Sequence, residues 1–201
     1  VWEGKASKMI ICETDRLILR DFCKSDIKKR IEWETRDTEW QKWDAPWESG
    51  EFAEESESLK KFIENLNAYA DKVSRKKEDD IRYAFQIEIK GTGEYIGWIN
   101  CYNIDDDYSY TDGDGKYAFG IDIPPQSCRG KGYGYEAFRA AIHYLTEHGL
   151  NEIYTQTWSG NERMIALAKK LGFVEIRRKK DLRVVDGKKY DNVKMSDVLE
   201  R

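Results

Sequence analysis

Two periods of apolar residues run through the chain and divide it into strands and helices. Alternating apolar and polar residues over a short stretch are typical of a strand, and apolar residues three or four apart are typical of a helix. The expected strands cover residues 17–20, 81–90, 95–103, 117–123 and 153–158, with two more within 173–199 around a turn at Asp186-Gly187. The expected helices cover residues 26–36, 51–77, 135–148 and 164–171. The pattern therefore mixes strands and helices along the whole chain.

Turn residues refine this division. Gly91-Thr92-Gly93 separates two strand-like runs and predicts a hairpin. Gly97, inside the second run, indicates a bulge or a close approach of another backbone segment. Residues 105–115 hold five aspartates and no basic residue, so we expect an exposed loop there.

Length and charge set wider limits. A chain of 201 residues suits one compact domain, which we place at residues 10–201 after a flexible N-terminus at residues 1–9. The net charge of −4 gives no argument for a nucleic-acid partner. The basic run at residues 177–180 is expected to be a solvated strand edge.

The cysteines argue against a metal site and for a reducing compartment. The four cysteines show no CxxC spacing, and the chain has only two histidines. We therefore expect no metal and a reduced, cytoplasmic protein. No apolar run approaches the ~18 residues of a membrane span, and the N-terminus shows no signal-peptide pattern. No membrane partner is expected.

The stretch most suggestive of function is Arg129-Gly130-Lys131-Gly132-Tyr133-Gly134, between the strand at 117–123 and a helix. Glycines let the backbone approach a ligand, and the unpaired N–H groups and dipole of a helix N-terminus attract anions. A diphosphate fits such a site.

A P-loop is excluded because Gly132 stands where Ser or Thr is required. A dinucleotide-binding domain needs more chain than the final third provides. A glycine-rich turn that only caps the helix remains the alternative.

Two motifs in order point to one family. Arg129, Gly132 and Gly134 satisfy the pattern Arg/Gln-x-x-Gly-x-Gly/Ala, which resembles the coenzyme A pyrophosphate loop of the GNAT superfamily of N-acetyltransferases. Downstream, Asn161, a short helix and Gly172-Phe173 resemble the second signature of that superfamily. The resemblance is strong over residues 117–174. It implies an α+β (α/β sandwich-like) fold, with a mixed, mostly antiparallel sheet of about seven strands flanked by helices. The sheet would be splayed between its fourth and fifth strands, where acetyl-CoA sits.

The resemblance also implies roles for individual residues. Backbone groups of Ile121 and Ile123 would pair with the pantetheine arm, and the Ile123 N–H would polarise the thioester carbonyl as an oxyanion donor. The loop amides would hold the pyrophosphate; they belong to Arg129, Gly130, Lys131, Gly132, Tyr133 and Gly134. Asn161 would contact the cofactor arm or brace the loop, or else only cap its helix.

The proton carriers do not follow from the resemblance. The family often places a tyrosine where this chain has Ala168, and Lys116 replaces a glutamate that some members use as a base. Asp122 is the nearest carboxylate on the cofactor strand and Tyr154 the nearest phenol on the next strand. Both are candidate catalytic residues, and both could equally be structural.

The acceptor side is expected beneath the two early helices. Trp40, Trp43 and Trp47 could form an aromatic wall for the acceptor or pack the helices on the sheet. Asp44 and Glu48 could attract a cationic amine.

The leading hypothesis is an acetyl-CoA-dependent N-acetyltransferase that acts on a peptide N-terminus or small amine by direct attack in a ternary complex. The pattern looks closest to the branch with the ribosomal-protein N-terminal acetyltransferases. The alternative is a non-catalytic acyl-CoA-binding or sensing module. The acceptor, and the choice between monomer and homodimer, stay open.

Overall fold

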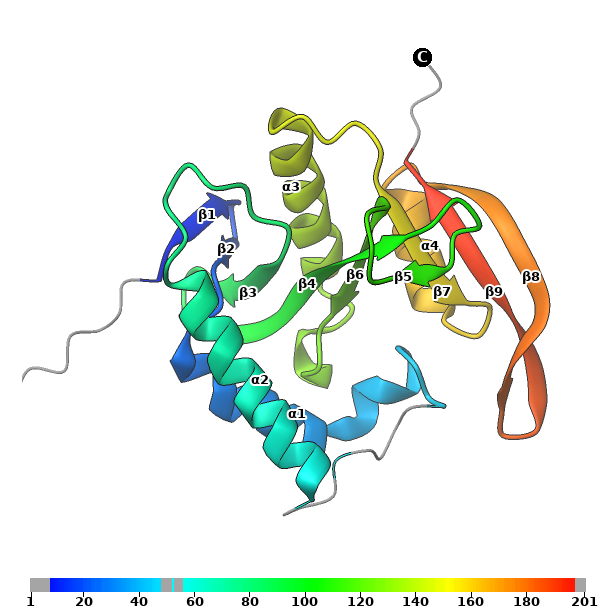
Figure 1. Cartoon of the computed structure of the whole chain (residues 1–201), viewed down its shortest axis with the longest axis horizontal. Coiled ribbons are helices and arrows are strands. Elements are labelled where there is room, and N and C mark those ends of the chain that lie inside the picture. Colours follow the sequence, from blue (N-terminus) through cyan, green and yellow to red (C-terminus); the bar gives the residue numbers. More distant parts are fainter. Residues whose placement is uncertain (1–7, 48–51, 53–55, 198–201) are drawn as a thin grey trace, which may run out of the picture.

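The computed structural model describes residues 8–47, 52 and 56–197, and it shows one mixed sheet flanked by helices (Figure 1). The strands are β1 (Ile10–Glu13), β2 (Leu17–Arg20), β3 (Phe85–Ile89), β4 (Tyr95–Ile104), β5 (Tyr110–Thr111), β6 (Lys116–Asp122), β7 (Tyr154–Trp158), β8 (Val174–Val185) and β9 (Lys188–Ser196). The helices are α1 (Ile27–Thr35), α2 (Glu57–Val73), α3 (Tyr133–Glu147) and α4 (Glu162–Lys170). The expected α+β architecture is confirmed.

The sheet has nine strands in the described part of the chain, two more than expected. The first addition, β1, pairs antiparallel with β2 and forms the edge of the sheet. The second, β5, is a two-residue strand that pairs with β4 inside the aspartate-rich loop. β5 has only two residues, and β1 has three apolar residues in succession at positions 10–12, so neither shows the alternation that indicates a strand. Each expected strand and helix is present.

Some element ends differ from the prediction. The second helix begins at Glu57 rather than at residue 51, because the Ser56 hydroxyl caps it by accepting a hydrogen bond from the Leu59 N–H. Residues 48–51 and 53–55 lie outside the described residues, and with them the Glu48 hypothesis. Residues 1–7 of the expected flexible N-terminus also lie outside. Lys8 forms an ion pair with Glu88, and the Met9 carbonyl accepts a hydrogen bond from the Asp21 N–H.

The strand order is β1-β2-β3-β4-β6-β7-β9-β8, and every neighbouring pair is antiparallel except β6 with β7. Along the parallel pair, only Ala118 and Tyr154 are in register. By contrast, β4 and β6 pair continuously from Ile104–Lys116 to Trp98–Asp122. The strands β6 and β7 thus meet at their N-terminal ends and separate towards their C-terminal ends. The expected splay is confirmed.

Helices cover both faces of the sheet. The main core lies against α3 and α4, where Ala137, Phe138 and Met164 pack with Phe119 of β6. A separate cluster joins α1 to α2, and Figure 1 shows these helices side by side below the N-terminal strands. The β8–β9 hairpin projects at the other side of the molecule. Within the described residues, no helix combines the length and apolar character needed to cross a membrane.

The turn and glycine predictions are confirmed. Asp186 and Gly187 both have positive φ, as a two-residue hairpin turn of this hand requires. At Gly97 the β3–β4 register shifts, and a Cβ built there would lie 2.0 Å from the Asp122 carbonyl oxygen. The chain therefore needs glycine at this position so that the end of β6 can lie against β4.

Candidate functional site

A cavity of about 920 Å³ occupies the gap where β6 and β7 separate. One wall is the end of β6, residues 120–123, and the other is residues 156–158 of β7. The glycine loop, residues 129–134, and the tryptophan segment, residues 37–47, contribute the remaining sides. In sheets with parallel strands, ligands bind at the carboxyl ends, where neighbouring strands diverge. The cavity has this position.

The glycine loop is shaped to present backbone N–H groups. Gly130 and Gly132 have φ of +72° and +85°, a region that residues with a Cβ rarely adopt. Gly132 is the N-cap of α3, with no side chain bound to the first helical N–H groups. Gly130, Gly132, Tyr133 and Gly134 line the cavity. The start of α3 therefore offers unpaired donors and a positive dipole end to an anion.

Arg16, in the turn between β1 and β2, holds this loop from outside. Its guanidinium donates to the Lys131 carbonyl at 3.0 Å and lies 4.7 Å from the centre of the Tyr133 ring. In a trans peptide the C=O and the following N–H point in opposite directions. A Lys131 carbonyl directed at Arg16 therefore turns the Gly132 N–H the other way.

Glu136, in the first turn of α3, anchors Arg16 in turn. Its carboxylate accepts from the Thr14 hydroxyl at 2.6 Å, from the Arg16 N–H at 3.0 Å and from Arg16 Nε at 2.7 Å. Burial opposes ionisation, but these hydrogen bonds outweigh it and keep the Glu136 pKa below its usual value. The sequence analysis missed Arg16 and Glu136, because 120 residues separate them and no local pattern links the two.

The Arg129 guanidinium is already engaged within the protein. Its Nε donates to the Ile123 carbonyl at 2.8 Å, and its terminal nitrogens bind the Pro124 carbonyl and the Glu39 carboxylate. Arg129 thereby ties the loop to the end of β6 and to the tryptophan segment. Because these groups bind its guanidinium, Arg129 supports the shape of the loop and its side chain does not point freely towards a ligand. Glu39 was not foreseen either.

Asn161 is the N-cap of α4. Its Oδ1 accepts from the Met164 N–H at 3.0 Å, and its Nδ2 donates to the Trp43 carbonyl at 2.6 Å. The Trp43 carbonyl also accepts from Trp158 Nε1 at 2.9 Å. Of the roles considered for Asn161, helix capping is observed, together with a brace to the tryptophan segment at the cavity wall.

Asp122 lies between the main cavity and a smaller one of about 240 Å³. The smaller cavity is lined by Arg30 and Glu34 of α1, by Asp44, and by Trp98 of β4. Burial raises the Asp122 pKa well above its ordinary value; the charges of Asp44 and Glu34 raise it further, and Arg30 opposes them. A buried carboxyl with a raised pKa at the wall of a cavity is a candidate for proton exchange with a ligand.

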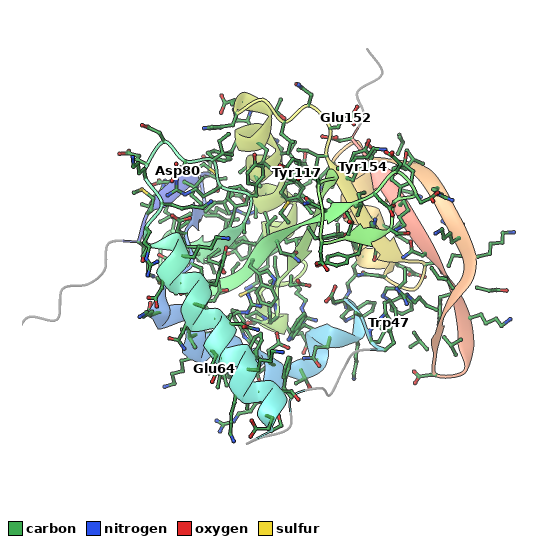
Figure 2. All side chains as sticks on the ribbon, viewed as in Figure 1. Trp47, Glu64, Asp80, Tyr117, Glu152 and Tyr154 are labelled. Atoms are coloured by element: carbon green, nitrogen blue, oxygen red, sulfur yellow. The ribbon has the colours of Figure 1, made fainter. Side chains whose placement is uncertain are left out.

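Tyr154 lies elsewhere. It sits at the paired end of β7, and its hydroxyl donates to Glu152 at 2.9 Å. The lining of the main cavity does not include it. Figure 2 shows Tyr154 beside Glu152, well away from Trp47 at the tryptophan segment. Its surroundings, including the nearby Tyr108 ring, are those of a packing residue.

The three tryptophans of the segment take two kinds of position. Trp40 is buried against Trp33 and Trp98, and its Nε1 donates to the Trp33 carbonyl at 2.8 Å. Trp43 and Trp47 line the cavity, and the Trp47 ring meets the Trp158 ring edge to face. All three tryptophans therefore line the cavity, and Trp40 also packs the segment on the sheet.

The comparisons with known proteins agree with this geometry. The sequence model of the acetyltransferase (GNAT) domain matches residues 16–174. No curated protein sequence matches the chain. The fold and the cavity at the splay define a protein of the acyltransferase class. The chain belongs to the GNAT acetyltransferase family.

Solved structures share its fold. The RimL ribosomal L7/L12 alpha-N-protein acetyltransferase matches with a TM-score of 0.67 and 15% identity, over 99% of each chain. A GNAT-family acetyltransferase from Bacillus anthracis matches with a TM-score of 0.66 and 17% identity, over 94% of this chain and 97% of that one. Spermidine N-acetyltransferase from Vibrio cholerae, solved with CoA and spermine, matches with a TM-score of 0.64 and 19% identity, over 91% and 95%.

Proposed function

We propose that the protein is an acetyl-CoA-dependent N-acetyltransferase that moves an acetyl group to a primary amine, on a peptide N-terminus or a small molecule. One observation carries the proposal: the splay of β6 from β7 and the glycine loop at the start of α3 open into the same cavity. Membership of the GNAT family and solved relatives that contain CoA support it.

The cofactor would lie along this cavity. The pyrophosphate would accept hydrogen bonds from the amides of residues 130–134, because the Arg129 N–H already donates to the Gln126 carbonyl at 3.1 Å. The pantetheine arm would run between β6 and β7 beside the backbone of Ile121 and Ile123. Gly132 adopts a positive φ that a residue with a Cβ rarely takes, and a Cβ there would lie 3.3 Å from Arg16 Nη2. We assign Asn161 a bracing role, because both of its polar side-chain atoms are occupied.

Direct transfer needs a neutral amine, a polarised carbonyl and a proton for the leaving thiolate. The amine nitrogen would attack the thioester carbon, the Ile123 N–H would stabilise the oxyanion, and the C–S bond would break as CoA thiolate leaves. The ionised Asp122 would take one proton from the substrate ammonium group to give the neutral amine. The nitrogen would lose a second proton after it bonds the acetyl carbon, and that proton would go to the thiolate, which leaves as the CoA thiol. At pH 7, deprotonating a lysine amine costs roughly 4–5 kcal/mol and an α-amine only about 1.4 kcal/mol. The α-amine is therefore the easier acceptor.

Trp40, Trp43 and Trp47 would line the acceptor site, since all three line the cavity. Two of the solved relatives are a ribosomal L7/L12 alpha-N-protein acetyltransferase and a spermidine N-acetyltransferase, and both acceptors carry primary amines. Because the acceptors of these two relatives differ, we propose a class of acceptor and not one compound.

The proposed function is tested by measuring turnover of acetyl-CoA in the presence of amines. Purified protein with acetyl-CoA is offered a panel of α-amino peptides, polyamines and amino acids, with thiol release and product mass recorded. We expect thiol release that depends on the amine and yields an equal amount of acetylated product. Tight acetyl-CoA binding without acetylation of any amine would instead identify a non-catalytic acyl-CoA-binding module.

A further inference from the structure

The cavity continues past the end of β6 to the β8–β9 hairpin, where its lining becomes basic. Arg163, in the first turn of α4, and Arg183, on β8, both line this end, together with Asn192 of β9. Arg163 is exposed at the mouth and Arg183 is half-buried. Asp44 and Asp122 contribute carboxylates to the lining of the same cavity.

Both guanidinium groups rest on tryptophan faces. Arg163 Cζ lies 4.0 Å from the centre of the Trp43 ring, and Arg183 Cζ lies 4.4 Å from that of Trp47. A guanidinium stacked in this way is fixed in direction while its N–H edge stays available for hydrogen bonds. The stacking therefore positions two cations at the wall of the cavity at little further cost in side-chain entropy.

Within the described residues, the guanidinium groups of Arg163 and Arg183 have no hydrogen-bond acceptor. No side-chain hydrogen bond or ion pair of Arg163 or Arg183 occurs within the described part of the chain. Arg183 Nε is buried without a hydrogen-bond partner, which is costly unless a ligand supplies one. Glu39 lies within the field of Arg163, but it forms its ion pair with Arg129.

The surrounding field favours an anion as well. Burial, followed by neighbouring cations that include Arg183, lowers the pKa of the Lys194 ammonium group to about 8. Lys194 itself donates to the Tyr108 carbonyl. The cavity lining that the hairpin and α4 contribute therefore carries positive charge.

We propose that Arg163 and Arg183 form a subsite for an anionic group of the acceptor, so that the acceptor carries a carboxylate in addition to its primary amine. The inference rests on the proposed function and narrows its substrate class to acidic amines, such as acidic amino acids or peptides with an acidic residue near the N-terminus. The amine would lie at Asp122 and the carboxylate at the arginines. Bidentate Arg–carboxylate pairing gives both direction and affinity.

A cofactor phosphate is the other source of negative charge. The glycine loop already offers the site for the pyrophosphate, and the two arginines stack on the tryptophan segment instead of bordering that loop. We therefore assign the subsite to the acceptor and let the experiment separate it from the 3′-phosphate of CoA.

The experiment measures binding and turnover of matched acceptors. The peptide amides Ser-Glu-Ala and Ser-Gln-Ala, and the amino acids glutamate and glutamine, differ only by one carboxylate and keep nearly the same amine pKa. Each is titrated calorimetrically into the protein–CoA complex. We expect the acidic member of at least one pair to bind about tenfold more tightly or better, and Arg183→Gln with Arg163→Gln to remove that preference. Arg183→Lys should keep part of it, and Arg75→Gln, a surface change after α2, should keep all of it.

Several results would overturn the inference. Equal affinity for both members of each pair would do so, as would a preference that survives in the double variant. Loss of CoA affinity in the double variant, with dephospho-CoA affinity unchanged, would assign the subsite to the 3′-phosphate. A carboxylate preference in binding without turnover would uphold the subsite and refute the proposed N-acetyltransferase, so the two failures are distinguishable.

Discussion

Asp122 shows how the position of a single residue determines its chemistry. It ends β6 and lines both the main cavity and the smaller cavity beside α1, and burial and nearby carboxylates raise its pKa. Its place on the cofactor strand was readable from the sequence. Its partners were not, because Glu34, Asp44 and Arg30 reach it from a helix and a segment about 80 to 90 residues earlier. Sequence spacing carries no signal for such contacts.

Asp122→Asn tests this residue through activity. General base catalysis is worth roughly 10²- to 10⁴-fold, so kcat/KM should fall by about 100-fold or more. The limb of the pH profile that belongs to Asp122 should disappear, whereas the limb set by the acceptor amine should remain and move with the amine pKa. Asp114→Asn, in the exposed loop, is the control. An unchanged pH profile in Asp122→Asn would remove the residue from the mechanism.

Stability gives an independent readout of the same group. Because the Asp122 pKa is raised in the folded protein, its ionised form opposes folding, and stability falls as pH rises through the folded pKa. Asp122→Asn should therefore melt at a higher temperature than the unmodified protein at pH 8. The difference should vanish below about pH 4, the ordinary aspartate value. A difference that is constant over this range would contradict the raised pKa.

At the scale of elements, the strands and helices followed from periodicity, but the contacts that shape the site did not. The hairpin at residues 91–93, the glycine loop before α3 and the turn at Asp186-Gly187 were all predicted, since turn residues act locally. The braces of the loop are long-range: Arg16 to Glu136 and Arg129 to Glu39. Among the described strands, β1 and β5 were not predicted, because neither alternates apolar and polar residues.

Gly97→Ala tests how closely two elements must approach. The new Cβ would lie 2.0 Å from the Asp122 carbonyl oxygen, a backbone atom that cannot move without shifting the end of β6. We expect a loss of roughly 2–4 kcal/mol in unfolding free energy, measured by urea denaturation. Gly91→Ala is the matched control, because a Cβ there meets nothing within 4 Å. Equal stability of the two variants would show that β4 and β6 lie further apart.

At the scale of the whole molecule, the cavity exists because the sheet is divided. The strands before β6 and those after β7 form two antiparallel halves joined at a single register position, and the tryptophan segment spans the gap on one side. Glu39 binds Arg129 beside β6, and the Trp43 carbonyl binds Trp158 and Asn161 beside β7. A ligand in the cavity would touch both halves, so its binding should stabilise the fold as a unit.

The most direct test of the central claim is a calorimetric titration with acetyl-CoA of the unmodified protein and of Gly132→Glu, with NAD as the unrelated dinucleotide. Glutamate at position 132 puts a side chain and a negative charge at the N-terminus of α3, in a backbone conformation at φ +85° that it rarely adopts. We predict that the unmodified protein binds acetyl-CoA and not NAD, and that Gly132→Glu stays folded by circular dichroism but loses acetyl-CoA binding. Acetyl-CoA binding of equal affinity in both proteins, or in neither, would contradict the assignment of the splayed strands and glycine loop as the cofactor site.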